Sequence, residues 1–471
     1  MDPSRTDSTR YLCAAAYLDK PFRDQAIAEL LEDRHRAVAT MPGVGIATVL
    51  KHCLAARRRK TVRDLILTGL AVVGAFIALR AEEPTVVVPF VLAAWLVVSW
   101  ERWATTYGIV AKRLSRRSFD PGSVEASGNP DVRTALKRLA SVQEGNVMVS
   151  GGFSPFPGCG LDIGGWSLVV DLQKGKEDIQ GRLQPQAVAV EDLYTQAANA
   201  VTGLGLERVE INDKLCVNGQ DLRDDPRFLP DPYGRPVAWV DSVVVKEFVV
   251  NPTQSVRHYK SIRVIDWSGE LVLSVFLRFS KIAQKLFVET SYFLLTPVRE
   301  RFHQTDWLNP KPTVRQWLSL LVESAVLSPF LVALSPLFIV GKLLHRWDLW
   351  NRRGQTRRSI AENRAFNYGP TSSIREAASD KVYRRYFQKL DKEMYVKMLE
   401  RSILDSTIDF LEAKNVDISD LKERKTTILN SGVIVSGGSI EAKSLAVGQR
   451  ARALVTRVRT AGAPKGAPVT L

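Results

Sequence analysis

Histidine and cysteine are the residue types that most often supply metal ligands and nucleophiles, and in this chain both are scattered. The 471 residues contain four cysteines and five histidines. None of them forms a CxxC pair or another spacing typical of a zinc or haem site. His52 and Cys53 are the only adjacent pair, which fits a helix face. The sequence therefore predicts no metal site and no cofactor, and the low cysteine use fits a reducing compartment.

A glycine-rich segment at 158–165 is the next candidate for chemistry, because glycine loops can cradle phosphates. Gly158-Cys-Gly160 is followed by Gly164-Gly165. However, Ile163 stands where a dinucleotide fingerprint needs its third glycine, and the chain has no Gly-Lys-Ser/Thr triplet of a Walker loop. We interpret this segment as a turn between strands.

Carboxylates could pair with basic groups for acid–base chemistry. Arg278 and Glu289 are expected on adjacent strands, where a structural ion pair is the main interpretation and catalysis the alternative. Asp266, Glu270 and His258 are close in sequence, but no regular spacing makes them an acid–base set. The sequence therefore predicts no catalytic residue.

Two apolar runs near the N-terminus are the first structural elements that the sequence predicts. Residues 65–79 and 85–100 contain no charged side chain. Helices of this length cover about 22–24 Å, less than the ~30 Å of a bilayer core, so a buried soluble hairpin is the alternative. Trp95, Trp100 and Trp103 fit an interfacial aromatic belt. We expect a transmembrane helical hairpin over residues 61–103.

Basic residues flank this hairpin on both sides, whereas the turn between its helices carries Glu82 and Glu83. The positive-inside rule therefore places both flanks in the cytoplasm and the turn outside. Basic side chains beside a bilayer also attract anionic lipid head groups, by about 1 kcal/mol each. The flanking residues expected at the membrane are Arg57, Arg58, Arg59, Lys60, Arg113, Arg116 and Arg117.

A second apolar segment at 315–346 contains Glu323, Pro329 and Pro336. Both of its flanks are basic, so a single span would carry one basic flank outside. A re-entrant or two-segment hairpin broken near Pro329 keeps both flanks cytoplasmic, but each arm is then only about 12 residues long. A single span and a soluble buried helix pair are the alternatives. The basic residues on its C-terminal side are Lys342, Arg346, Arg352 and Arg353.

Residues 118–310 predict a cytoplasmic α+β domain built on an antiparallel sheet. Strand-like segments at 146–149 and 166–172 precede a helix at 190–201, and further strands follow at 208–217, 261–267, 270–279 and 286–295. Asn212-Asp213 predicts a hairpin turn within 208–217, and Ser268-Gly269 predicts another between the next two strands. Both faces of the last strands are apolar, so we expect both to be covered.

Four further segments complete the predicted organisation. Residues 1–60 form a helical cap, with a helix from 22 to 38 whose start is marked by Asp19 and Pro21, and another at 46–56. Residues 347–370 are basic and turn-rich and predict a linker. Residues 371–415 predict a long amphipathic helix that begins after Ser372 or Ser373. Residues 460–471 predict a disordered tail.

The segment at 424–450 alternates short apolar, β-prone pieces with Asn, Ser and Gly, and 426–440 carries almost no charge. Such a segment can stack in register as strands with an asparagine ladder. It resembles the short RHIM-like amyloid-signalling motifs of bacterial immune effectors, which implies an interaction motif for self-association or a protein partner. Strands that turn over their own chain or extend the central sheet are the alternative. The motif residues are Asn430, Gly432, Val433, Ile434, Val435, Gly437, Gly438 and Ile440.

The overall layout also resembles uncharacterised actinobacterial multi-pass membrane proteins. The resemblance lies in Gly-Phe-Ser-Pro-Phe at 152–156, Gly-Gly-Trp at 164–166 and Asp-Trp-Ser-Gly-Glu-Leu at 266–271. It implies no particular activity.

The formal net charge of +15 would suit a nucleic-acid binder, but the basic blocks adjoin the apolar segments and no nucleic-acid-binding signature occurs. We therefore expect a membrane-anchored bacterial protein, without enzymatic activity, that acts as an effector, scaffold or signalling partner. Its N- and C-terminal portions would be cytoplasmic. The alternative is a membrane-tethered enzyme that acts on lipid or nucleotide, with its site in residues 146–300.

Overall fold

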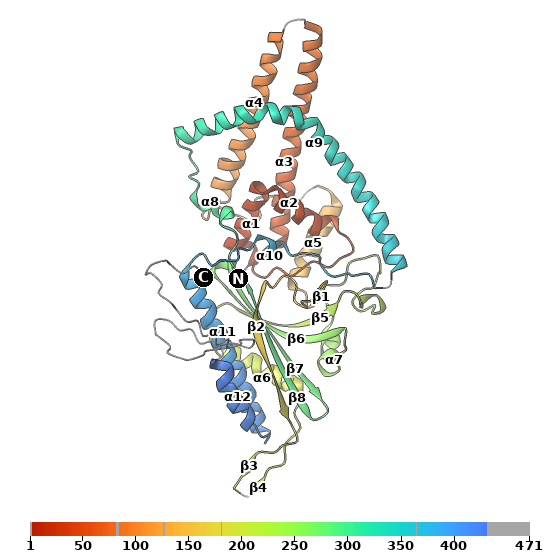
Figure 1. The fold of residues 1–471 in the computed structure, drawn as a ribbon, viewed down its shortest axis with the longest axis vertical. Helices are drawn as coiled ribbons and strands as arrows, with labels where there is room; N and C mark the ends of the chain where they lie inside the picture. Colours follow the sequence, from red (N-terminus) through yellow and green to blue (C-terminus); the bar gives the residue numbers. More distant parts are fainter. Residues whose placement is uncertain (1, 82–83, 126–127, 180, 364, 431–471) are drawn as a thin grey trace, which may run out of the picture.

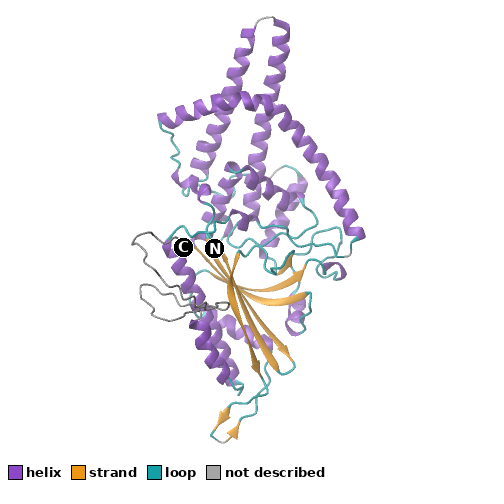
Figure 2. Ribbon diagram, in the orientation of Figure 1, coloured by secondary structure: helices purple, strands orange, loops and turns teal. Residues whose placement is uncertain are grey.

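The computed structural model describes residues 2–81, 84–125, 128–179, 181–363 and 365–430. Most helices gather at one end of the molecule, and a β-sheet with further helices beside it occupies the other end (Figure 2). Two antiparallel helices project from the helical end, and the N-terminal helices lie between them and the sheet (Figure 1). The chain thus has the mixed α+β organisation that the sequence predicts.

The N-terminal segments form a helical cap. Its helix α1 is almost completely buried, and the small residues at 14–16 let it pack closely on its neighbours. α2 begins as predicted, because the Asp19 side chain accepts a hydrogen bond from the Phe22 amide at 3.3 Å and Pro21 lies in the first turn. The elements of the cap are η1 (Pro3–Arg5), α1 (Asp7–Leu18), α2 (Lys20–Ile27), the π-helical η2 (Ala28–Glu32) and α5 (Pro130–Glu144).

Two helices continue from the cap as the projecting hairpin. α3 (Ile46–Ala81) runs without a break from the cap through the basic block into the first apolar run. The chain returns through η3 (Pro84–Val87), α4 (Val88–Trp103) and the π-helical η4 (Ala104–Arg113). The predicted end of a helix near residue 56 is therefore wrong, because the arginines and lysine at 57–60 are good helix formers and continue it.

A third apolar helix, α9 (Val314–Glu362), crosses this hairpin partway along its length (Figure 1). One arm lies across the hairpin and the other descends toward the sheet, and Pro329 and Pro336 lie inside the helix, where proline causes bending. At the far end Ile360 is fully buried in the sheet domain, and its carbonyl oxygen accepts a hydrogen bond from Arg223 Nη1 at 2.6 Å. Both ends of α9 therefore return to the body of the molecule.

Small residues line the face of α9 that packs on the hairpin. Ser324, Ser328 and Ser335 are buried in a stripe that begins at Leu320. The hydroxyl oxygens of Thr68 in α3 and Ser335 are 3.1 Å apart. Small side chains let helices approach closely, as they do in membrane helix pairs.

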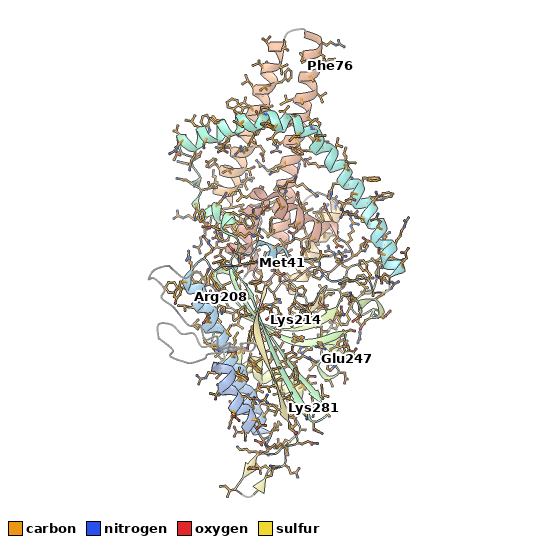
Figure 3. All side chains as sticks on the ribbon, in the orientation of Figure 1. Met41, Phe76, Arg208, Lys214, Glu247 and Lys281 are labelled. Atoms are coloured by element: carbon orange, nitrogen blue, oxygen red, sulfur yellow. The ribbon has the colours of Figure 1, made fainter. Side chains whose placement is uncertain are left out.

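The outer faces of these three helices are apolar and exposed. Phe76, near the free end of the hairpin (Figure 3), is 57% exposed. Ile46–Arg80, Thr85–Arg113 and Val314–Glu362 are long and apolar enough to cross a membrane, and only 17% of the most apolar stretch of each is buried. This pattern is compatible with membrane association.

Six strands form the main sheet in the order β1-β5-β6-β7-β8-β2. The edge pair of β1 and β5 is parallel and the other neighbouring pairs are antiparallel. β3 (Glu177–Asp178) and β4 (Gly181–Arg182) form a separate small hairpin. The six strands are β1 (Val147–Ser150), β2 (Leu161–Asp171), β5 (Val209–Asn218), β6 (Val256–Asp266), β7 (Leu271–Ile282) and β8 (Lys285–Leu295).

The register of the sheet confirms two sequence predictions and contradicts one. β6 and β7 are joined at 267–270, as Ser268-Gly269 predicts. Arg278 lies opposite Glu289, with Nη1 3.4 Å from Oε2. The hairpin turn predicted at residues 212 and 213 is wrong. β5 passes straight through them, because β6 pairs with it continuously from Val209 to Val217.

Both faces of the sheet are covered, as the apolar strand pattern predicts. α6 (Val190–Thr202) and α11 (Tyr386–Ala413) cover one face, where Leu277 and Val288 share an apolar cluster with Ile403. On the other face Phe156, from the loop after β1, stacks on Phe276 with 3.8 Å between ring centroids. The remaining helices are η5 (Leu222–Asp224), α7 (Ser242–Val250), η6 (Trp267–Gly269), η7 (Glu300–His303), α8 (Gln304–Trp307), α10 (Ile374–Ala378) and α12 (Ser419–Asn430).

Three expectations for the C-terminal third differ from the structure. Most of the predicted linker at 347–370 is helical, because α9 continues to Glu362. The helix predicted over 371–415 is split into α10 and α11, since Ser379 leaves the helix to bridge Val298. Residues 424–430, predicted as strand, complete α12 instead, where residues 422–425 are charged helix formers. Residues 431–450 and the tail at 460–471 lie outside the described residues.

We expect a disulfide between α3 and α9 in the double variant Thr68→Cys/Ser335→Cys, because the two hydroxyl oxygens are 3.1 Å apart. Oxidation of the full-length protein in membranes should shift its mobility on a non-reducing gel. The two single variants are the controls, since the native cysteines are buried and unpaired. If no intramolecular disulfide forms in the double variant, α9 does not cross the hairpin as described.

Candidate functional site

A cavity of about 510 Å³ opens where the cap, the sheet and the start of α11 meet. We call it the Trp267 pocket. Its charged lining residues are Asp7, Arg116, Arg208, Glu270, Asp306, Arg384 and Arg385, and its other lining residues are Tyr11, Trp267, Ser268, His303 and Trp307. Segments from six parts of the chain therefore converge on one polar cavity.

The η6 turn forms one wall of the pocket. Trp267 and Ser268 both have left-handed backbones, with φ of 51° and 54°, a conformation that costs about 1 kcal/mol or more for such residues. Hydrogen bonds hold this turn. Asp266 accepts from the Trp267 amide at 2.7 Å, Ser268 Oγ accepts from the Asp7 amide at 3.0 Å, and Trp267 Nε1 donates to Asp391 at 2.9 Å. The strained turn is fixed from both the cap and α11.

A buried guanidinium lies beneath the pocket. Arg10 Nη1 donates to Asp306 Oδ1 at 2.6 Å, and Nη2 donates to Oδ2 at 3.1 Å. Arg10 also pairs with Asp7 at 3.0 Å, and the Tyr11 hydroxyl donates to Asp306 at 2.6 Å. Burial of Asp306 opposes ionisation, but the hydrogen bonds from Arg10 and Tyr11 hold its pKa below the ordinary value.

His303 and Glu270 form a buried pair at the back of the pocket. His303 Nε2 hydrogen-bonds with Glu270 Oε1, and Nδ1 lies 3.2 Å from the Arg299 carbonyl oxygen. A carbonyl oxygen only accepts, so Nδ1 donates, and one further proton lies between Nε2 and the carboxylate. The Tyr11 ring packs on the imidazole, with 3.9 Å between ring centroids. Because both ring nitrogens are engaged, this histidine is not free to deprotonate a third group.

Two of the pocket arginines have carboxylate partners. Arg116 Nη2 is 3.3 Å from Asp7, and Arg208 Nη1 is 3.4 Å from Asp266. Figure 3 labels Arg208 near the upper part of α11. Both contacts are partly exposed, so each contributes little stability.

The other two arginines precede α11. In the described part of the chain, neither Arg384 nor Arg385 forms an ion pair with a carboxylate. The Arg385 guanidinium lies over the Trp267 ring, 5.4 Å from its centroid. Trp307, the last residue of α8, also lines the cavity and is 60% exposed. Two guanidinium groups and an aromatic surface thus face the cavity.

A second cavity of about 480 Å³ lies beside β5 and β6. It is lined by the 150–153 loop and by polar groups that include Asn218, Arg257 and Glu289. Glu289 already pairs with Arg278, which lowers its availability for a ligand. We therefore take the Trp267 pocket as the stronger candidate site.

Asp266, Glu270 and His258, which are close in sequence, do not form one acid–base set in the structure. His258 Nε2 bonds to Asp213 at 2.8 Å, whereas Asp266 and Glu270 have the partners described above. Burial opposes ionisation of Asp213, but hydrogen bonds from His258 and Lys260 lower its pKa to about 2. In the described residues no group of three metal-ligating side chains occurs. The pair of Glu270 and His303 was missed because no local spacing links residues 33 positions apart.

Several of the predicted membrane-flanking residues form ion pairs with the body of the protein. Arg57 contacts Glu32 at 2.9 Å and Lys342 contacts Asp64 at 2.7 Å. Arg352 pairs with Asp348 along α9 at 2.7 Å, and Arg116 lines the pocket. Arg58, Arg113, Arg117 and Arg346 are exposed, and Arg59, Lys60 and Arg353 are half-buried.

The predicted C-terminal motif has only its first residue in the described part of the chain. Asn430 is the last residue of α12. Gly432, Val433, Ile434, Val435, Gly437, Gly438 and Ile440 lie outside the described residues. The interaction motif therefore stays a prediction.

The model of the AbeC-like domain family matches residues 165–441 of this chain. The match covers more than half of the sequence, so the chain belongs to the family of proteins with an AbeC-like domain. A search of the curated proteins and a search of the solved structures each found no match. The matched region holds β5 to β8, most of β2, α9 and α11. It also holds all lining residues of the Trp267 pocket except Asp7, Tyr11 and Arg116.

We expect Asp306→Asn to destabilise the protein by about 2 kcal/mol near neutral pH, because Arg10 keeps its burial but loses its main anionic partner. The folded-state pKa of Asp306 lies below its unfolded value, so its stabilisation is present above about pH 4 and is lost as the pH falls below that. The difference between wild type and variant should therefore shrink in acid.

Chemical unfolding in detergent at several pH values tests this expectation. Glu177→Gln is the control, since its pair with Arg182 is exposed on the β3–β4 hairpin and should change stability by less than about 0.5 kcal/mol. An equal loss for Asp306→Asn at every pH would show that packing, not charge, makes the contribution.

Proposed function

We propose that this protein is a membrane anchor with a cytoplasmic signalling or scaffold domain. The α3–α4 hairpin would span the bilayer, and the cap, the sheet and α11 would face the cytoplasm. The observation that supports this most is the gathering of exposed apolar surface on α3, α4 and α9, at one end of the molecule. Apolar surface of this extent in a folded protein indicates contact with lipid or another protein.

The position of α9 supports a re-entrant or in-plane helix more than a single span. Both of its ends reach the body of the molecule, so both basic flanks would lie on the same side of the bilayer, as the positive-inside rule requires. Glu323 of its first arm pairs with Arg102 at 2.6 Å, which neutralises a charge next to apolar surface. The exposed arginines of the flanks would then contact anionic lipid head groups.

The ion pairs around Asp64 indicate how far the hairpin would insert into the bilayer. Asp64 pairs with both Arg63 and Lys342 at 2.7 Å, and Arg63 also lies 3.5 Å from Glu101. Beyond Asp64, α3 continues for about 26 Å to Ala81, and its residues 65–79 carry no charge. The ion cluster would therefore lie at the cytoplasmic interface, and the apolar hairpin would enter the hydrocarbon core.

A protein partner is supported by the first turns of α11. Tyr386, Phe387 and Met394 are exposed there next to the pocket arginines. We propose that this face and the predicted motif at 424–450 contact another protein or a second copy. The similarity to RHIM-like motifs and the actinobacterial origin stay predictions within this proposal.

A second candidate function is a membrane-tethered enzyme that acts on lipid or nucleotide. The convergence of polar side chains in the Trp267 pocket favours it, because a plain interaction face would lack such a cavity. The engaged state of both His303 nitrogens counts against acid–base catalysis. Loss of a substrate-dependent product signal in Glu270→Gln, with unchanged folding, would favour the enzyme.

Membrane anchoring predicts that alkaline carbonate leaves the full-length protein in the membrane fraction. Single cysteines then test the orientation. Thr85→Cys, at the end of the hairpin, should react with a membrane-impermeant maleimide in intact cells. Lys137→Cys, on the exposed face of α5, should react only after permeabilisation. The native cysteines give little background because all four are buried.

The outcomes separate the alternatives. Release of the protein by carbonate would overturn the anchor. Retention with labelling of Lys137→Cys in intact cells would reverse the proposed orientation.

A further inference from the structure

Four arginine side chains and three carboxylates line the Trp267 pocket. Asp7 and Asp306 are held by the buried Arg10, and Glu270 is held by His303. The nearby Asp266 accepts from Arg208 and from the Tyr395 hydroxyl. Asp391 accepts from Trp267 Nε1 at 2.9 Å. Each of these carboxylates therefore already has a hydrogen-bond or ion-pair partner other than Arg384 and Arg385.

Arg384 and Arg385 are not among the partners of these carboxylates. They come from one short segment before α11, and both line the cavity, although in the described part of the chain neither forms an ion pair with a carboxylate. A guanidinium presents a planar fork of donors that matches the oxygen atoms of a phosphate group. Two arginines adjacent in sequence, with Arg116 and Arg208 also lining the cavity, suit a ligand with more than one negative charge.

The rest of the cavity fits the organic part of such a ligand. Its volume of about 510 Å³ lies within the usual range for small-molecule sites. Trp307 is 60% exposed and offers a ring face, whereas one face of Trp267 is covered by Arg385. The strained η6 turn is fixed by hydrogen bonds, so the cavity is preformed.

We infer that the Trp267 pocket binds a phosphorylated small ligand, with Arg384 and Arg385 as its phosphate contacts. Two sources can supply this chemistry: a soluble nucleotide, or the head group of a phospholipid with a terminal phosphate. The lipid source is favoured by the position of the pocket in the chain. Arg116 lies three residues after η4, and Trp307 lies seven residues before α9, so two lining residues adjoin the apolar helices.

Titration calorimetry of the full-length protein in detergent, with ATP and with inorganic pyrophosphate as probes, tests the soluble source. Native mass spectrometry of the same sample, with phosphatidic acid compared with phosphatidylcholine, tests the lipid source. We expect binding in at least one arm, and the double variant Arg384→Gln/Arg385→Gln should weaken it about tenfold or more. Binding should also weaken as the salt concentration rises.

Matched variants separate the pocket from general effects. Arg401→Gln removes an arginine from the surface of α11, where it pairs with Asp405 at 3.5 Å, and should leave binding unchanged. Arg384→Gln alone should show a smaller loss without touching the Arg385 contact to Trp267. An unchanged melting temperature without ligand shows that the variants fold, since both positions are exposed.

The possible results decide the proposal. Loss of ATP or pyrophosphate binding in the double variant supports a soluble ligand, and loss of phosphatidic acid adducts supports a lipid. No binding of any probe, or binding equal in wild type and double variant, overturns it. Because these measurements use detergent-solubilised protein, they do not depend on the membrane orientation proposed above.

Discussion

The buried guanidinium of Arg10 is the contact on which the other parts of the molecule depend. From α1 it reaches Asp306 of α8 at 2.6 Å and the carbonyl oxygen of Leu114, just after η4, at 3.2 Å. It therefore joins the cap to the segment where the hairpin ends and to the segment that leads into α9. A buried cation without these acceptors would cost several kcal/mol, so the three segments must meet in one arrangement.

This constraint links the apolar helices to the polar pocket. The same Asp306 that receives Arg10 lines the pocket, and Trp307 beside it is the last residue of α8 before the chain turns toward α9. A ligand that contacts Arg116 and Trp307 would contact both the segment after η4 and the segment before α9. Binding free energy in the pocket would then be shared with the packing of α9 against the hairpin, which is the condition for coupling between a ligand and a membrane segment.

The sequence predicts those parts of the fold that local pattern determines. The uncharged runs indicate α3, α4 and α9, and alternating apolar residues indicate β7 and β8, because each signal lies within one element. Predictions based on turn and linker composition were wrong where tertiary pairing decides the outcome. Asn212-Asp213 has turn chemistry but lies within β5, because β6 supplies hydrogen bonds along its whole length. The linker at 347–370 is mostly helix, and buried Ile360 fixes its end.

The candidate site could not be predicted in the same way, because its contacts join residues distant in sequence. Arg10 and Asp306 are 296 residues apart, and neither has a neighbour that marks it for chemistry. Arg116 shows the difficulty most directly. Its position after an apolar run indicates a membrane-flanking residue, but in the fold it pairs with Asp7 and lines the pocket. A basic residue next to an apolar helix can therefore serve either purpose, and for Arg116 it is the position of Asp7, at the start of α1, that decides.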